Sequence, residues 1–212
     1  MDLRNTQNRA LLLEPVSKMR GNPIRHFESW FRAAQRAGEK HPDAMTLATA
    51  SKKGAPSARI VLYKGISEGR FKIFTNFESR KGKELRSNPR AALCFHWKAL
   101  DRQVRIEGRI RVMPRQDAVK YFHSRPRQSQ IGAWASHQSQ VIPSRRYLLQ
   151  RARHFEKQFE GQAIPMPSYW GGFLLVPERI EFWVDGKFRL HDRFVFEKTG
   201  RSPEWKVRRL SP

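Results

Sequence analysis

The segment Arg102-Gln-Val-Arg-Ile-Glu-Gly-Arg-Ile-Arg-Val-Met113 decides the fold class. Apolar residues at positions 104, 106, 110 and 112 alternate with charged residues at 105, 107, 109 and 111. Because the side chains of a strand point alternately to its two faces, this period predicts a strand with one apolar and one charged face. Such a strand is typical of an antiparallel sheet that covers a core on one side only.

Further strands are predicted on both sides of this segment. The same period of two and the composition typical of strands predict them at 45–49, 58–64, 70–75 and 91–97, and again at 178–184, 193–198 and 205–210. Lys53-Gly54 and Ser67-Glu68-Gly69 have the composition of hairpin turns. Trp170-Gly171-Gly172 is predicted to be a tight turn that leads into the later strands.

Helices are predicted before, between and after the first strands. Asn22-Pro23 is a helix start, and the apolar positions 27, 30, 31 and 34 that follow it form one helix face. Ser79 can cap a short basic helix over 80–86, and Pro114 opens a helical section whose last helix runs from 144 to about 159. Strands, helices and then strands predict one α+β domain with an antiparallel sheet closed into a barrel, over residues 22–212. Residues 1–21 are predicted to be weakly ordered.

The composition excludes several classes of protein. The chain has 212 residues, 39% of them hydrophobic, and it contains neither an apolar run of membrane-spanning length nor a signal-peptide pattern. Cys94 is the only cysteine, so an intramolecular disulfide and a thiolate metal cluster are both excluded, and no metal site is expected. These features favour a cytoplasmic protein.

The formal net charge of +23 is the strongest global signal, because such a surface attracts polyanions. The basic residues are spread along the chain, and no helix-turn-helix, zinc-finger or basic-zipper spacing is present. Nucleic-acid binding is therefore unfavoured, but it stays open as an alternative.

Candidate binding residues occur in four segments. The segment 121–139 combines arginine, serine, glutamine and tyrosine, which suits the binding of a small anion, although a solvated polar helix face is the alternative. Arg59 and Lys64 stand at the two ends of an apolar strand and are expected on opposite faces. A phosphate could bind where the strand ending at Thr75 meets the basic helix start at Arg80 and Lys81.

The fourth segment is Arg189-Leu-His-Asp-Arg193. In an extended chain Arg189, His191 and Arg193 share one face while Asp192 points away, so these cations are expected to need an anion or an electron-rich ring among them. The motifs of nucleophilic, metal-dependent and nucleotide-binding enzymes are absent from the sequence. The chemistry would therefore come from a cofactor.

Eight segments in unbroken order resemble the pyridoxine (pyridoxamine) 5′-phosphate oxidase family. They are Arg59-Ile-Val-Leu-Tyr-Lys64, Phe74-Thr-Asn-Phe-Glu-Ser-Arg-Lys81, Arg102-Gln-Val104, Tyr121-Phe-His-Ser-Arg-Pro-Arg-Gln-Ser-Gln-Ile-Gly-Ala-Trp134, Gln138-Ser139, Trp170-Gly-Gly-Phe173, Ile180-Glu-Phe-Trp183 and Arg189-Leu-His-Asp-Arg-Phe194.

This resemblance implies an FMN-binding split β-barrel, a homodimer with FMN at the subunit interface, and a role in vitamin B6 metabolism. The implied reaction oxidises pyridoxine or pyridoxamine 5′-phosphate to pyridoxal 5′-phosphate, with dioxygen reduced to hydrogen peroxide. By matched position, the FMN contacts are Arg59, Ile60, Val61, Leu62, Tyr63, Lys64, Phe74, Thr75, Arg80, Lys81, Gln103, Gln138, Ser139, Trp183 and Arg193. The substrate phosphate contacts are Lys64, Tyr121, Arg125 and Ser129, while Arg189 and His191 lie against the substrate ring as the catalytic pair.

Two departures from the family pattern keep alternatives open. Residues 18–23 lack the tyrosine of a segment that covers the substrate in the family, and Phe74 stands where tyrosine is usual. The first alternative is a related flavin oxidase of the same fold that acts on another ring, such as a dihydrophenazine precursor. The second is a basic protein that binds nucleic acid, flavin or pyridoxal phosphate without turnover.

Overall fold

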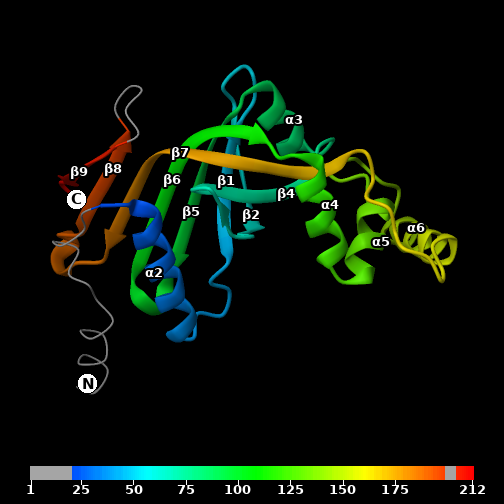
Figure 1. Ribbon diagram of the computed structural model, residues 1–212, viewed down its shortest axis with the longest axis horizontal. Coiled ribbons are helices and arrows are strands. Elements are labelled where there is room, and N and C mark those ends of the chain that lie inside the picture. The colour runs from blue at the N-terminus through cyan, green and yellow to red at the C-terminus, as the bar shows by residue number, and fades with distance from the viewer. Residues whose placement is uncertain (1–20, 199–203) are drawn as a thin grey trace.

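The computed structural model describes residues 21–198 and 204–212. Within this part of the chain, nine strands form one antiparallel sheet with helices packed beside it, which confirms the predicted α+β class (Figure 1). The predicted weakly ordered segment 1–21 lies, except for Gly21, outside the described residues.

The elements have the following bounds. The helices are α2 (Pro23–Arg36), α3 (Arg80–Ser87), α4 (Arg115–Ser124), α5 (Arg127–Ala135) and α6 (Arg145–Gln158), with short 3-10 turns at η2 (Lys98–Leu100) and η3 (Lys187–Arg189). The strands are β1 (Ala44–Ala50), β2 (Pro56–Leu62), β3 (Ile66–Ser67), β4 (Arg70–Asn76), β5 (Arg90–Trp97), β6 (Arg102–Val112), β7 (Trp170–Val184), β8 (Asp192–Lys198) and β9 (Trp205–Leu210).

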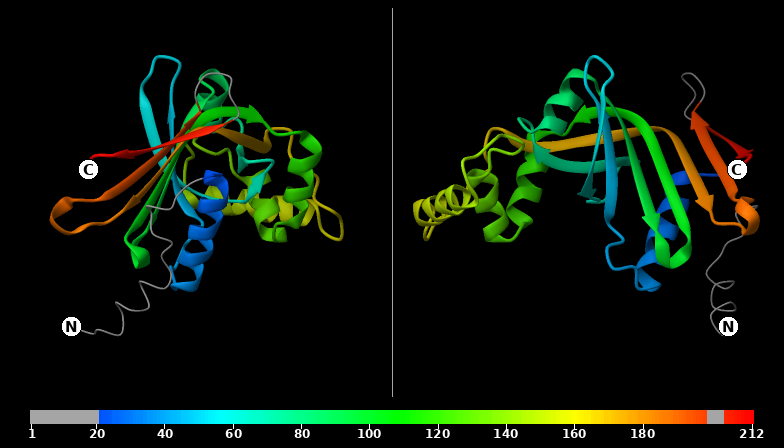
Figure 2. Two further views of the ribbon diagram at one scale, coloured as in Figure 1. Left: turned by 60° about the vertical axis from the view of Figure 1, so that its left-hand side comes forward. Right: turned by 180° about the vertical axis from the view of Figure 1, so that it is seen from behind.

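Strand β7 is the branch point of the sheet. The strand order is β2-β1-β5-β6-β7-β4-β3, and β8 followed by β9 branches from β7. One edge of β7 pairs with β6 along its length, while the other edge pairs first with β4 and later with β8. The sheet therefore divides along β7. Helices α4, α5 and α6 lie at one end of this strand and β8 and β9 at the other (Figures 1 and 2).

The structure corrects two predictions about strands. β7 begins at Trp170 instead of Glu178, so Trp170-Gly171-Gly172 is strand and not a turn. These glycines serve close packing, because a Cβ added at Gly171 would lie 2.4 Å from the Phe77 ring. The Glu68-Gly69 turn has the positive φ angles of a hairpin turn, but it joins β4 only to the two-residue β3.

The main core lies between the sheet and α2. Asn22 caps this helix by accepting the Ile24 N–H at 2.9 Å, as predicted. Phe27 is fully buried and packs against Phe71 and Phe95, with ring centroids 5.0 Å apart in both pairs. Burial of each such ring contributes about 1.5–3 kcal/mol, so the aromatic face predicted from the sequence fixes α2 on the sheet.

Strand β6 shows both the predicted alternation and its limits. Val104, Ile106 and Ile110 are buried, but Val112 at the strand end is 61% exposed. Arg102 is buried, unlike the other arginines of this strand, and its guanidinium lies 4.2 Å from the centre of the Trp30 ring on α2. Burial lowers the pKa of Arg102 to about 10. The side chain thus joins the start of β6 to α2 by a cation–π contact.

A second, smaller core holds the helices that follow β6. Phe122 of α4, Ile131 of α5 and Trp170 of β7 are buried in it together. Phe155 of α6 packs at its edge, with its ring 5.6 Å from that of Trp134. This cluster positions α4 and α5 beside the first half of β7 (Figure 2).

Gly108 marks a β-bulge where the backbone of β6 lies close to that of β7. A Cβ at this position would lie 2.0 Å from the carbonyl oxygen of Val176 on β7, so alanine can fit only if the strands separate. We therefore expect Gly108→Ala to lower the free energy of unfolding by about 2 kcal/mol, measured by urea denaturation of the protein without ligand.

The matched control is Gly132→Ala in α5, where a Cβ would meet no atom within 4 Å. Alanine favours a helix over glycine, so this variant should lie within about 1 kcal/mol of the wild type, on the stabilising side. Equal losses in the two variants would contradict the close approach at Gly108.

Candidate functional site

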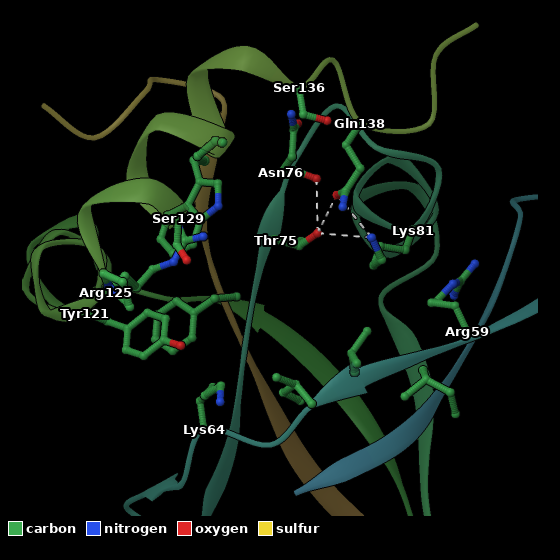
Figure 3. A pocket seen from close by; sticks show the side chains of 18 residues that line it. Arg59, Lys64, Thr75, Asn76, Lys81, Tyr121, Arg125, Ser129, Ser136 and Gln138 are labelled. Atoms are coloured by element: carbon green, nitrogen blue, oxygen red, sulfur yellow. Dashed lines mark hydrogen bonds between the residues drawn. The ribbon is translucent and has the colours of Figure 1, made fainter. Parts of the chain in front are cut away.

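A cleft of about 890 Å³ opens between the end of β2, β4 and the α4–α5 pair (Figure 3). Most of the predicted binding residues of the segments 59–64, 74–81 and 121–138 meet in it. The lining residues are Arg59, Ile60, Val61, Leu62, Lys64, Phe74, Thr75, Asn76, Lys81, Tyr121, Arg125, Pro126, Ser129, Gly132, Ala133, Ser136, Gln138 and Trp170.

Arg125 dominates one end of the cleft. It follows α4 and precedes Pro126, and its guanidinium lies 4.8 Å from the centre of the Trp170 ring. Its Nη1 atom is buried and has no hydrogen-bond partner among the described residues. Burial lowers the pKa of Arg125, and the nearby Tyr121 opposes this effect. A buried donor of this kind needs an acceptor, and a phosphate beside Ser129 and Lys64 would supply one.

Lys81 and Arg59 form a second cationic group in the same cleft (Figure 3). The Lys81 ammonium at the start of α3 donates to Thr75 Oγ1 at 3.3 Å and to Gln138 Oε1 at 3.2 Å. Burial lowers the pKa of Lys81, and the charge of Arg59 lowers it further. Within the described part of the chain, the hydrogen-bond partners of Lys81 are neutral, so its charge is available to stabilise a bound anion.

Aromatic and aliphatic side chains lie between the two cationic groups. The rings of Phe74 and Tyr121 stack with centroids 3.8 Å apart and an interplanar angle of 18°. On strand β2, Ile60 and Leu62 are 66% and 48% exposed beside them. An apolar surface flanked by two anion sites suits flat rings that bear phosphates, so the residues present fit FMN together with a phosphorylated ring substrate.

Arg59 and Lys64 both line this cleft, which corrects the prediction that they point to opposite faces. Strand β2 ends at Leu62, and the chain turns at Gly65, whose φ angle is +90°. The alternation of a strand therefore does not extend to Lys64.

The remaining predicted residues of the resemblance divide into two sets. Tyr63 contacts the core, with its ring 5.0 Å from that of Phe31, while Arg80 and Ser139 do not line the cleft. The other five lie at the far end of the sheet: Gln103, Trp183, Arg189, His191 and Arg193.

This far group is separated from the cleft by the length of β7. Gln103 pairs with Trp183, and Trp183 with Arg193, near the end of the strand that Trp170 begins in the cleft. At about 3.3 Å per residue, the 13 positions from Trp170 to Trp183 span roughly 40 Å. The two predicted groups therefore do not meet within one chain (Figure 1).

The far group also differs from the prediction in detail. Arg189 lies in η3 with a φ angle of +64°, and β8 begins only at Asp192, so 189, 191 and 193 do not share one extended face. Arg193 is not an uncompensated cation, because its Nη2 atom lies 2.8 Å from Glu181 Oε1. The His191 ring lies 4.6 Å from that of Trp183, and its Nδ1 atom lies 3.1 Å from Asp185 Oδ1.

Several residues at the cleft are not assigned to it by the sequence. Asn76, Ser136 and Trp170 line the cleft, and Glu84 contacts Arg59 from outside the lining. Trp170 lies in a family motif, but the turn expected at this position gives no reason to place its ring in the cleft. Glu84 had no signal, because an acidic residue in a basic helix usually serves solubility alone.

Family models match most of the chain. The model described as pyridoxamine 5′-phosphate oxidase matches residues 31–159, and that described as pyridoxine 5′-phosphate oxidase C-terminal dimerisation region matches 170–212. A pyridoxine/pyridoxamine 5′-phosphate oxidase of Paraburkholderia phytofirmans is 50% identical and covers 93% of this chain and 92% of that protein. The pyridoxine-5′-phosphate oxidase of Bos taurus is 47% identical and covers 90% of this chain and 78% of that protein.

Solved structures share the fold. PhzG from Burkholderia lata, in complex with tetrahydrophenazine-1-carboxylic acid, is 28% identical with a TM-score of 0.88, and the match covers 94% of this chain and 97% of that one. A pyridoxamine 5′-phosphate oxidase-related, FMN-binding protein from Nostoc punctiforme has a TM-score of 0.71 at 16% identity, covering 92% and 100%. The predicted split barrel is confirmed by these folds. Since the family's own model matches more than half of the chain and relatives near half identity span nine tenths of it, this chain belongs to the pyridoxamine 5′-phosphate oxidase family.

Proposed function

We propose that this protein oxidises pyridoxine 5′-phosphate or pyridoxamine 5′-phosphate to pyridoxal 5′-phosphate, with dioxygen as acceptor and hydrogen peroxide as the second product. Family membership confirms the predicted class of enzyme, an oxidoreductase, and the predicted cofactor, FMN. The observation that best supports the phosphorylated substrate is the buried, unpartnered Nη1 atom of Arg125 beside Tyr121 and Ser129. A planar guanidinium held in this way binds two phosphate oxygens at once.

The residues of the cleft would bind the two phosphates at separate places. Arg125, Ser129, Tyr121 and Lys64 would hold the phosphate of the substrate, and the group around Arg59 and Lys81 would hold that of FMN. The stacked rings of Phe74 and Tyr121 would limit the access of water from that side. FMN supplies the two-electron oxidation of the substrate carbon and the transfer of those electrons to dioxygen.

The far group would complete the cleft of a second subunit. The matched dimerisation region, 170–212, contains Trp183, Arg189, His191 and Arg193. β7 keeps these residues remote from the cleft of their own chain. In a symmetric homodimer with FMN at the interface, the far group of each subunit would meet the cleft of the other, which would give two equivalent sites. Arg189 would then lie against the substrate ring and assist removal of a proton, with His191 as its neighbour.

A flavin oxidase that acts on another ring is the second candidate, and the likeness to PhzG is the observation that favours it. A substrate without a phosphate would leave Arg125 Nη1 without a partner, which disfavours this candidate. Residues 18–20 of the segment that departs from the family pattern lie outside the described residues. The cytoplasmic location stays a prediction.

The activity itself can be tested with the purified protein. We expect yellow protein with bound FMN that converts pyridoxine 5′-phosphate in air to aldehyde and peroxide in equal amounts. Colour without turnover of either phosphate ester would favour the second candidate. Colourless protein retained on DNA in a salt-sensitive way would favour the polyanion-binding alternative.

Arg189→Met tests the proposed catalytic role. We expect kcat to fall by at least about 100-fold, because a group that moves a proton in the transition state is lost. FMN retention, measured by absorbance after gel filtration, should stay as in the wild type. Unchanged turnover would show that Arg189 has no catalytic role.

Heterodimers test whether the site is shared between subunits. An Arg125→Met subunit and an Arg189→Met subunit, co-expressed with two different affinity tags, should form heterodimers with about half of the wild-type activity, because one of the two sites contains both intact arginines. Each variant homodimer should have little activity.

The control pairs a wild-type subunit with one that carries both substitutions. If the site is shared, each of the two sites in this heterodimer lacks one arginine, and its activity should be as low as that of the variant homodimers. Half of the wild-type activity in the control, and none in the first pair, would place both arginines in a site within one subunit.

A further inference from the structure

Glu84 is a buried carboxylate that no catalytic or binding role yet explains. It lies in α3 one turn after Arg80, and the residue is only 7% exposed. Its Oε1 atom accepts a hydrogen bond from Arg80 Nε at 2.9 Å. Its Oε2 atom accepts from Thr49 Oγ1 at 2.5 Å, from Ser57 Oγ at 2.6 Å and from Arg59 Nη2 at 3.3 Å. Each oxygen of Glu84 therefore contacts an arginine, Arg80 or Arg59, near the Lys81 end of the cleft.

Two hydroxyl groups link Glu84 to Arg59 indirectly as well. Arg59 Nη1 donates to Thr49 Oγ1, and Arg59 Nη2 donates to Ser57 Oγ, each at 2.5 Å. A carboxylate cannot donate, so both hydroxyls must point their hydrogens to Glu84 and their lone pairs to Arg59. The orientation of the two hydroxyls, and with it the position of the Arg59 guanidinium, thus depends on the charge of Glu84.

The network keeps Glu84 ionised. Burial would raise the pKa of this carboxyl group, but the hydrogen bonds from Ser57, Thr49, Arg80 and Arg59 outweigh it and lower the pKa to about 2. The helix that bears Glu84 is also fixed in place. Ser79 caps α3 by accepting the Gly82 N–H, and a Cβ at Gly82 would lie 2.5 Å from the Phe77 carbonyl oxygen. The capped and closely packed helix therefore fixes the position of the Glu84 carboxylate behind the cleft.

We propose that Glu84 is a positioning residue for the FMN phosphate, which acts by holding Arg59 in the orientation that receives that phosphate, while its bond to Arg80 anchors the carboxylate in α3. This inference rests on the proposed function, since it assigns the Arg59 and Lys81 group to FMN. Lys81 is held separately from Glu84, because its ammonium donates to Thr75 and Gln138. Loss of Glu84 would therefore weaken the contribution of Arg59 and leave that of Lys81.

Glutamine is the most informative replacement for Glu84. It has nearly the same shape, but its amide has one oxygen and one NH₂ group, so it can accept from one arginine only and presents donors to the other. The substitution also removes a negative charge near the phosphate, which by itself would tighten FMN binding. Weaker FMN binding by the variant would therefore indicate that Glu84 orients the arginine, whereas tighter FMN binding would indicate the effect of its charge alone.

The experiment compares FMN with riboflavin, which has the same ring system and no phosphate, by fluorescence titration of the apoprotein. For Glu84→Gln we expect FMN to bind about tenfold more weakly, since hydrogen bonds between charged groups are disturbed, and riboflavin to bind as to the wild type. The ratio of the two affinities is the readout, because a merely structural role would weaken both flavins alike.

Two further variants make the result interpretable. Glu78→Gln removes the same charge from an exposed residue just before α3 and should leave both affinities unchanged. Ser57→Ala removes one bridging hydroxyl while Glu84 stays in place, and it should lower the FMN affinity selectively but by less. It also tests the network if Glu84→Gln does not fold.

Three outcomes would overturn the inference. FMN binding to Glu84→Gln that is unchanged or tighter would show that the carboxylate does not orient Arg59 for the phosphate. An equal loss for both flavins would assign Glu84 to the stability of the fold alone. A wild-type apoprotein that binds neither flavin would contradict the proposed function itself, and the role of Glu84 would fail with it.

Discussion

The pairing of β7 is the constraint on which the rest of the structure depends. One edge of this strand needs a continuous partner, which β6 supplies, while the other edge is shared between β4 and β8. Because each backbone N–H and C=O group on one edge of a strand pairs with a single neighbour, β4 and β8 occupy different parts of this edge, and the sheet divides between them. The cleft forms at the β4 end, where the α4–α5 pair packs against the first half of β7. The far group forms at the β8 end. The extended backbone of β7 keeps the far group and the cleft apart.

The distribution of carboxylates explains why a strongly basic chain can have specific anion sites. Arg193 is paired with Glu181, and Arg59 and Arg80 share Glu84. Arg125 and Lys81 form no ion pair with a carboxylate of the described residues, and burial lowers the pKa of each. Exposed cations attract phosphates only weakly in salt, whereas partly buried and unpaired cations retain their interaction. Arg125 and Lys81 therefore distinguish the cleft from the rest of the basic surface more than the total charge of +23 does.

The proposed homodimer gives the far group a chemical role that it lacks in the single chain. Arg189 is exposed at the end of β7, and His191 is held by Asp185 and by the Trp183 ring. His191 lines a hollow of about 390 Å³, less than half the volume of the cleft. A symmetric partner would bring an arginine to the substrate ring in the opposite cleft.

The sequence by itself determined the local elements and the chemical character of the site. The alternation at 102–113 and the aromatic face at 27–34 predict β6 and α2, because these periods follow from backbone geometry alone. The family motifs identified most residues of the cleft. Tertiary structure decided what depends on direction and distance: that Arg59 and Lys64 share one cleft, that Tyr63 enters the core, and that Glu84 stands behind the arginines. It also decided that Arg189 lies remote from Arg125, because only strand pairing determines where the two ends of β7 lie.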